Sequence, residues 1–300
     1  TQGLFAIGEA EGQRSKAGTG RVVSCGVITL TSNEEITVSQ FKRRVSGLSA
    51  LSVLSAAVFA GLGVAEQAQA GTATGNIGVY SKYVLRGITN DTENDGTTVQ
   101  GGFDYAADNG FFVGYWGSNL DYTYYAGTPP AVTTKTGFEN DFYAGYGFKA
   151  GSLSFTVGAT QYYYVEVDDS NLFEPFATVA MGPVTVGVKY LAQDGVWGNK
   201  GDMYWTFAAG TDLPKGFKLA GTLGYYMYEK NDNAELCGGP AGCGATKTDS
   251  AFRHLDLTLS HPIGKTGADM MVTYVIGGEN RGKVDQENAV VLGIKYPFDL

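Results

Sequence analysis

Apolar and polar positions alternate with a period of two in many short segments of the chain. The clearest segment lies at 250–261, where Leu255, Leu257 and Leu259 share one face and the polar residues from His254 to Ser260 share the other. Successive side chains of a β-strand point to opposite faces. The pattern therefore predicts strands that have apolar surroundings on one side and polar surroundings on the other.

Segments of this kind recur along the chain after residue 70, rich in Tyr, Phe, Val and Gly and separated by turn residues. Twelve can be recognised, at 75–87, 97–106, 110–119, 138–149, 152–164, 172–181, 183–193, 202–212, 217–229, 250–261, 267–277 and 287–298. A tilted strand of about 9–11 residues crosses the hydrocarbon core of a membrane. Each segment is long enough for this.

The connections between the segments alternate strictly between short and long. The short ones lie at 107–109, 150–151, 182, 213–216 and 262–266, and the long ones at 88–96, 120–137, 165–171, 195–201, 230–249 and 278–286. Outer-membrane barrels combine short periplasmic turns with longer external loops, whereas a soluble sandwich or propeller has no reason to do so. We therefore expect an all-β protein, a transmembrane antiparallel β-barrel of about twelve strands, with both termini in the periplasm.

The first 70 residues lack this pattern. A basic cluster at Lys42, Arg43 and Arg44 precedes an apolar stretch at 45–65 and a small-x-small motif at 68–70. These are the parts of a secretory signal peptide, so we assign 38–70 to a signal peptide and 71–300 to the barrel; a membrane anchor is the alternative. Residues 1–37 are expected to be a non-native or unstructured extension, from a reading frame that starts too early, or part of an unusually long leader.

Composition narrows the class of protein further. The chain has 44 Gly, 19 Tyr and 16 Phe, and only 17% of its residues are charged, against about a quarter in a soluble domain. Its mean hydropathy of −0.09 is too polar for a helical membrane protein. After residue 70, 15 Lys and Arg stand against 25 Asp and Glu, a net charge of about −10, which argues against nucleic-acid binding.

Three segments near the start of the barrel region resemble the TorF family of proposed porins. They run from Tyr80 to Thr89 (YSKYVLRGIT), from Val99 to Tyr105 (VQGGFDY) and from Gly110 to Asn119 (GFFVGYWGSN). The resemblance implies an outer-membrane barrel and a porin function, but no substrate and no functional residues. One departure is at the C-terminus, where Asp299 and Leu300 follow Phe298; the assembly machinery commonly reads a final aromatic residue there.

The alternation places many charged residues on the inner face. They are Lys82, Arg86, Asp104, Glu139, Asp141, Glu174, Lys189, Arg253, His254, Asp256 and Lys295. Buried unpaired charge is costly, so these residues must meet water or each other. They would line a pore in an open barrel or form a salt-bridge network in a plugged one, and both interpretations stay open. For Arg86, which lies near the outer end of the first strand, we favour pairing with a loop carboxylate, Asp91 or Glu93, over a pore-lining role.

Other groups carry weaker signals. Cys237 and Cys243 are expected to form a disulfide within one loop. Tyrosines at 122, 124, 125 and 162–164 are expected to form a girdle at the membrane interface. The sequence Asp91-x-Glu93-x-Asp95-Gly96 starts like a calcium loop, but Gly102 stands where the final Glu would fall. His254 and His261 have no serine motif beside them.

We therefore expect neither an enzyme nor a bound cofactor or metal. The function expected is passive diffusion of small hydrophilic solutes or ions across the bacterial outer membrane. The alternative is a closed, adhesin-like barrel that acts structurally or through its loops. The expected partners are outer-membrane lipid, lipopolysaccharide and the assembly machinery, which would contact the C-terminal strand; the sequence does not indicate an oligomeric state.

Overall fold

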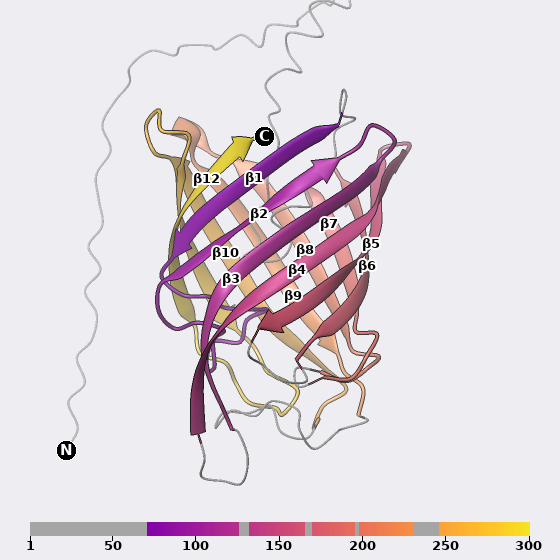
Figure 1. The fold of residues 1–300 in the computed structure, drawn as a ribbon, viewed down its shortest axis with the longest axis vertical. Coiled ribbons are helices and arrows are strands. Elements are labelled where there is room, and N and C mark those ends of the chain that lie inside the picture. Colours follow the sequence, from indigo (N-terminus) through magenta and orange to yellow (C-terminus); the bar gives the residue numbers. More distant parts are fainter. Residues whose placement is uncertain (1–70, 126–131, 166–169, 196–197, 231–245) are drawn as a thin grey trace, which may run out of the picture. The chain divides into compact units, whose positions relative to one another are not determined.

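The computed structural model describes residues 71–125, 132–165, 170–195, 198–230 and 246–300 (Figure 1). These residues contain twelve strands and one 3-10 turn, Pro214–Gly216. The strands are β1 (Thr72–Tyr80), β2 (Thr98–Ala106), β3 (Phe111–Tyr125), β4 (Val132–Ala150), β5 (Leu153–Val165), β6 (Leu172–Met181), β7 (Val184–Tyr190), β8 (Met203–Asp212), β9 (Lys218–Met227), β10 (Ser250–Pro262), β11 (Asp269–Gly277) and β12 (Ala289–Asp299). In the described part of the chain, no helix is long and apolar enough to cross a membrane.

The strands form one closed barrel in which each strand pairs antiparallel with its neighbours in the chain. The barrel closes where β1 pairs with β12, with Thr74 opposite Asp299 and Tyr80 opposite Gly293. Strands related in this way need only short connections, and the pairing of β1 with β12 removes the two edges that an open sheet would have. The predicted fold class, an antiparallel barrel of about twelve strands, is confirmed.

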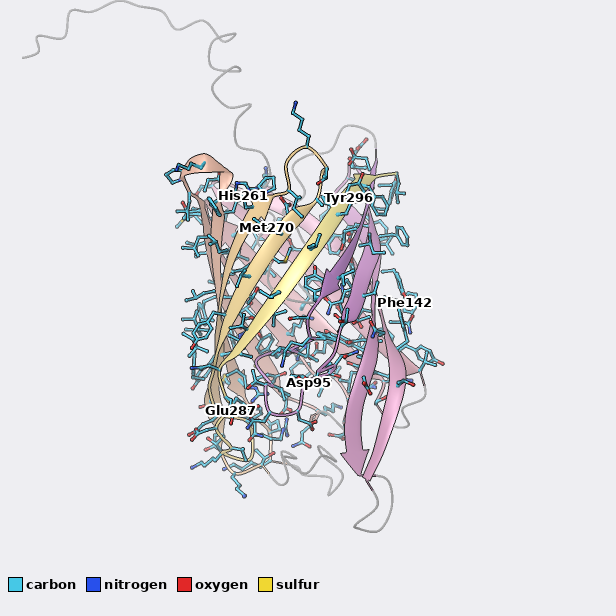
Figure 2. All side chains as sticks on the ribbon, turned by 90° about the vertical axis from the view of Figure 1, so that its left-hand side faces the viewer. Asp95, Phe142, His261, Met270, Glu287 and Tyr296 are labelled. Atoms are coloured by element: carbon cyan, nitrogen blue, oxygen red, sulfur yellow. The ribbon has the colours of Figure 1, made fainter. Side chains whose placement is uncertain are left out.

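The outer and inner faces of the barrel differ as the alternation predicts. Outward side chains are apolar and exposed, such as Phe142 at 53%, Leu292 at 54% and Ile294 at 52%. Figure 2 shows Phe142 and Tyr296 on the outside of the wall, and Asp95 and Glu287 together at the end that carries the long loops. Buried charged and polar side chains occupy the other face of the same strands.

Glycines allow neighbouring strands to approach closely. A Cβ atom on Gly102 of β2 would overlap the backbone carbonyl oxygen of Tyr115 on β3. At Gly147 of β4, by contrast, the nearest atom would be the Phe155 carbonyl oxygen at 3.8 Å, an ordinary contact. The high glycine content therefore has a structural role at particular positions in the wall.

The predicted strand boundaries hold within a few residues except at two places. β1 ends at Tyr80, so the prediction of a first strand to residue 87 is wrong, and Lys82 and Arg86 belong to the connection 81–97. The strands β3 and β4 continue beyond the positions where β2 and β5 pair with them. Most of the predicted loop 120–137 is therefore a two-stranded extension of the wall (Figure 1).

Candidate functional site in the barrel lumen

The connection 81–97, called here the first loop, folds into the barrel. Tyr83 is 1% exposed and packs edge-on against Trp116 of β3, with ring centroids 5.6 Å apart. The next residue, Val84, packs with Val275 of β11 and Val291 of β12. Adjacent residues of the loop thus contact two different parts of the wall, because the loop lies in the lumen and has protein on both sides.

A tight turn in the first loop places Arg86. Its φ of 47° and the φ of 71° at Gly87 are both in the left-handed region. A Cβ on Gly87 would overlap the Cβ of His254 on β10. Glycine is needed at this position for both reasons, and the turn brings the Arg86 side chain into the interior.

Arg86 makes a two-pronged ion pair with Glu174 of β6. Its Nη1 and Nη2 atoms donate to Glu174 Oε1 at 2.9 Å and Oε2 at 2.5 Å. Nη1 also donates to the Tyr226 hydroxyl on β9 at 2.6 Å, and the guanidinium lies 4.8 Å from the ring centroid of Tyr204 on β8. In a ring of twelve strands, β6 and β7 lie on the far side from β1. Arg86 therefore bridges the lumen.

Two further groups complete this cluster. The Tyr162 hydroxyl on β5 donates to Glu174 Oε2 at 2.8 Å, and Lys189 Nζ on β7 donates to that hydroxyl at 2.5 Å. Lys189 Nζ is also 3.7 Å from Glu174 Oε2. Glu174 and Lys189 are 3% and 2% exposed, so one carboxylate stands between two buried cations.

Three acidic side chains lie near Tyr83. Glu139 and Asp141 of β4 are 0% and 1% exposed, and Glu93 of the first loop is 7% exposed. The Tyr164 hydroxyl donates to Glu139 Oε1 at 3.0 Å. Both carboxylate oxygens of Asp141, and Oε2 of Glu93 and Glu139, have no hydrogen-bond partner among the described residues. No group of three or more His, Cys, Asp or Glu in the described ranges is arranged to hold a metal ion.

This acidic environment changes the pKa values of first-loop groups. Burial, and then repulsion from Glu139 and Asp91, raises the pKa of Glu93 well above its usual range. Burial and the carboxylates of Glu139 and Glu93 raise the pKa of Tyr83. Burial is the largest single influence on Arg86 and lowers its pKa, but the combined attraction of Glu174, Tyr226 and Tyr162 outweighs burial and holds the Arg86 pKa above its ordinary value. The first loop therefore carries a firmly charged arginine and a glutamate that holds its proton more tightly than usual.

An irregularity in β10 turns two consecutive residues inward. The pairing of β10 with β9 shifts between Phe252 and His254, which is a β-bulge. Arg253 and His254 are accordingly 3% and 2% exposed. His254 Nδ1 lies 2.8 Å from Asp256 Oδ1, and Nε2 lies 2.7 Å from the Tyr204 hydroxyl.

The remaining predicted lumen residues lie apart from this cluster. Asp104 of β2 is partly buried and accepts a hydrogen bond from the Tyr143 hydroxyl at 2.5 Å. Lys295 of β12 is 9% exposed. Lys82 pairs with Asp95 at 2.8 Å in the first loop, and the Asp95 side chain is 80% exposed.

Hydrogen bonds and an ion pair join the long loops to one another next to the cluster. Arg281, between β11 and β12, forms a buried ion pair with Asp202, which precedes β8. Asp202 Oδ1 also accepts from the backbone nitrogen of Glu229 at 2.9 Å. On the other side, Gln286 Oε1 accepts from the backbone nitrogen of Thr89 in the first loop at 3.1 Å. Burial raises the pKa of Asp202 although Arg281 opposes the shift.

A cavity of about 70 Å³ lies between these loops and the Arg86 cluster. Among its lining residues are Arg86, Glu93, Tyr226, Arg253 and Arg281. A cavity needs about 10–15 Å³ to hold one water molecule. This one has room for several water molecules or for a small polar solute.

Two sequence-based interpretations are wrong. Arg86 does not pair with Asp91 or Glu93; it pairs with Glu174, because the first loop turns inward and reaches the opposite wall. The second is the girdle at the membrane interface expected of the tyrosines at 162–164. Tyr162 and Tyr164 are 2% and 4% exposed and face the lumen, whereas Tyr163 is 49% exposed and faces outward.

Other contributors were missed or cannot be placed. Tyr204, Tyr226, Asp202 and Arg281 were not singled out. For Tyr226, the period-two spacing from Tyr228, like that of the tyrosines at 162 and 164, was an available signal. Cys237 and Cys243, residues 1–70 and the side chains of the tyrosines at 122, 124 and 125 lie outside the described residues, so the disulfide, the signal peptide and that part of the girdle stay predictions.

The fold and site together define a class: a closed antiparallel barrel with an apolar exterior and a charged lumen crossed by its first loop. A family model described as "Bacterial protein of unknown function (Gcw_chp)" matches residues 64–275. The chain belongs to this family. The match does not confirm the resemblance to the TorF family, and no curated protein sequence matches the chain.

Several solved outer-membrane proteins share the general fold at low similarity. The KdgM porin in complex with disordered oligogalacturonate is 11% identical with a TM-score of 0.41, over 75% of this chain and 98% of its own. The NanC porin is 10% identical with a TM-score of 0.45, over 75% and 99%. An outer-membrane channel from Pseudomonas putida F1 is 8% identical with a TM-score of 0.46, over 79% and 98%.

Proposed function

We propose that the barrel lies in the bacterial outer membrane and acts as a porin-like channel for small hydrophilic solutes or ions, with its narrowest point at Arg86. A belt of exposed apolar side chains suits contact with lipid, since soluble proteins rarely expose continuous apolar surfaces of this extent. In this location its partners would be outer-membrane lipid, lipopolysaccharide and the assembly machinery, which would contact β12.

The single observation that carries the proposal is the crossing of the lumen by Arg86. A loop that folds inward and places a charged pair across the lumen narrows the barrel without filling the whole length of the lumen. Charges of both signs surround that point. Glu139 and Asp141 are on β4, and Arg253 is on β10, which is diametrically opposite β4 in the ring of twelve strands. These side chains are buried in this structure, so in the open channel an ion that passes the first loop would have the acidic side chains of β4 on one side and Arg253 on the other.

A closed barrel that acts through its loops is the second candidate. The ion pair of Arg281 with Asp202 and the bonds from Gln286 to the first loop favour it, because they hold several loops together over the lumen. The two candidates differ in one measurable property, the conductance of ions across a bilayer.

The test is single-channel conductance of residues 71–300 refolded into planar bilayers. Arg86→Ala and Lys189→Ala are compared with Lys82→Ala, which removes a cation of the same first loop that pairs outside the cluster. We expect discrete steps from the wild type, larger steps and altered ion preference for Arg86→Ala, altered ion preference for Lys189→Ala, and little change for Lys82→Ala. Silence from wild-type protein that migrates as a folded, heat-modifiable barrel would exclude the channel and support the closed barrel.

A further inference from the structure

Three arginines and three carboxylates line the cavity between the loops and Arg86, but only two of the arginines form an ion pair with a described residue. Arg86 pairs with Glu174, and Arg281 pairs with Asp202. The remaining cation in the lining is Arg253, and no carboxylate of the described residues lies within ion-pair distance of its guanidinium. Glu93 also lines the cavity but forms no ion pair with Arg253, and burial and the neighbouring acids raise its pKa.

Arg253 is poorly satisfied for a buried arginine. It is 3% exposed, its Nη1 donates to the Glu279 carbonyl oxygen at 3.1 Å, and its Nε has no hydrogen-bond partner among the described residues. Its guanidinium also lies 5.8 Å from the ring centroid of Tyr226. A guanidinium has five N–H donors in a fixed fork that suits a carboxylate, and an uncompensated buried charge is strongly unfavourable.

We infer that this cavity binds the carboxylate group of a small solute, with Arg253 as its anchor. The inference rests on the proposed channel function and names its solute class, small carboxylates. The Tyr226 hydroxyl accepts a hydrogen bond from Arg86 and keeps its own proton, so it can donate to the same carboxylate. The position between the joined loops and the Arg86 crossing makes the cavity a stopping point on the path inward.

The β10 bulge explains why this arginine is available. Regular alternation cannot account for the inward position expected above for both Arg253 and His254, because neighbouring residues point to opposite faces. With His254 inward, Arg253 would point toward the outside of the barrel. The extra residue of the bulge turns it inward beside His254 instead. Bulges are frequent next to binding sites because they redirect one side chain without changing the rest of the strand.

The test is equilibrium binding of acetate to the refolded, detergent-solubilised barrel, measured by saturation transfer to the acetate methyl group. Acetamide, a neutral molecule of nearly the same shape, is the matched ligand control. We expect the wild type to bind acetate and not acetamide. Arg253→Gln should weaken acetate binding roughly tenfold or more, because a charge-assisted forked contact is lost. Arg253→Lys should fall between the two, since it keeps the charge and loses the fork.

Lys247→Met is the control variant, because it removes an exposed cation from a loop at the same end of the barrel. It should bind acetate as the wild type does. Equal binding of acetate and acetamide, or undiminished acetate binding by folded Arg253→Gln or Arg253→Lys, would overturn the inference. The binding measurement does not depend on conductance. Acetate binding without conductance would therefore reject the channel and keep the cavity as a carboxylate site. Conductance without acetate binding would keep the channel and reject the carboxylate site.

Discussion

The ion pair between Arg86 and Glu174 is expected to be a main contribution to the position of the first loop. Both side chains are shielded from water, at 14% and 3% exposure. Breaking a buried pair by removing one partner costs about 3–5 kcal/mol, because the other charge is left uncompensated. The pair can therefore be tested by removing each partner alone and then both together.

The structure predicts an order among the variants. In Arg86→Met, Glu174 keeps Lys189 at 3.7 Å and the Tyr162 hydroxyl at 2.8 Å, so the loss should be near the lower limit, about 3 kcal/mol. In Glu174→Gln, both Arg86 and Lys189 lose their carboxylate, and the loss should approach about 5 kcal/mol. The double variant removes the pair as a unit, so its loss should be smaller than the sum by about 2 kcal/mol or more.

The assay is urea unfolding of the barrel in lipid vesicles, followed by tryptophan fluorescence. The control is Lys82→Met, whose partner Asp95 is 80% exposed, so that its effect should be about 0–1 kcal/mol. Strictly additive losses, with a coupling energy below about 0.5 kcal/mol, would show that Arg86 and Glu174 do not interact as described. A smaller loss for Glu174→Gln than for Arg86→Met would refute the role given to Lys189.

Three other predictions concern the first loop, the joined loops and the wall. The Glu93 pKa is raised in the folded protein, so ionisation of Glu93 opposes the folded loop at any pH above the ordinary glutamate value near 4.5. Glu93→Gln should therefore increase the hydrogen-exchange protection of residues 81–97 at pH 8 and leave it unchanged at pH 4. Asp202→Asn breaks the buried pair with Arg281 and should speed proteolysis of the loops roughly tenfold or more, while equal rates would show that the pair does not hold them. Gly102→Ala should prevent formation of the heat-modifiable barrel because its Cβ would meet backbone, whereas Gly147→Ala should fold, and normal folding of both would contradict the packing described for β2 and β3.

The strands could be predicted because local periodicity reports which face of the wall a side chain occupies. β10 is the clearest case: Leu257 and Leu259 are both 39% exposed, and Thr258 and Ser260 between them are buried. The first strand was extended too far for a related reason. Val84 continues the inward alternation of Tyr80 and Lys82, but it lies in a loop that is buried on both sides. Periodicity cannot distinguish such a loop from a strand.

The pairings within the lumen could not be predicted, because they join elements that are far apart in the sequence. Arg86 and Glu174 are 88 residues apart, and Arg86 and Tyr226 are 140 apart. Nearby carboxylates such as Asp91 were the natural partners from the sequence alone. Which charge meets which depends on the inward path of the first loop, and that path depends on the left-handed turn at Arg86 and Gly87.

Some contacts favour the place of the first loop in the lumen and others oppose it, and both bear on whether the loop can move. The apolar contacts of Tyr83 and Val84 and the ion pair of Arg86 favour its place in the lumen. Burial of Glu93 among other acids opposes it, and so does the left-handed backbone of Arg86, which costs about 1–3 kcal/mol for a residue other than glycine. A purely structural plug would gain nothing from either unfavourable term. In the channel proposed above, both unfavourable terms would lower the free energy needed to move the first loop out of the lumen.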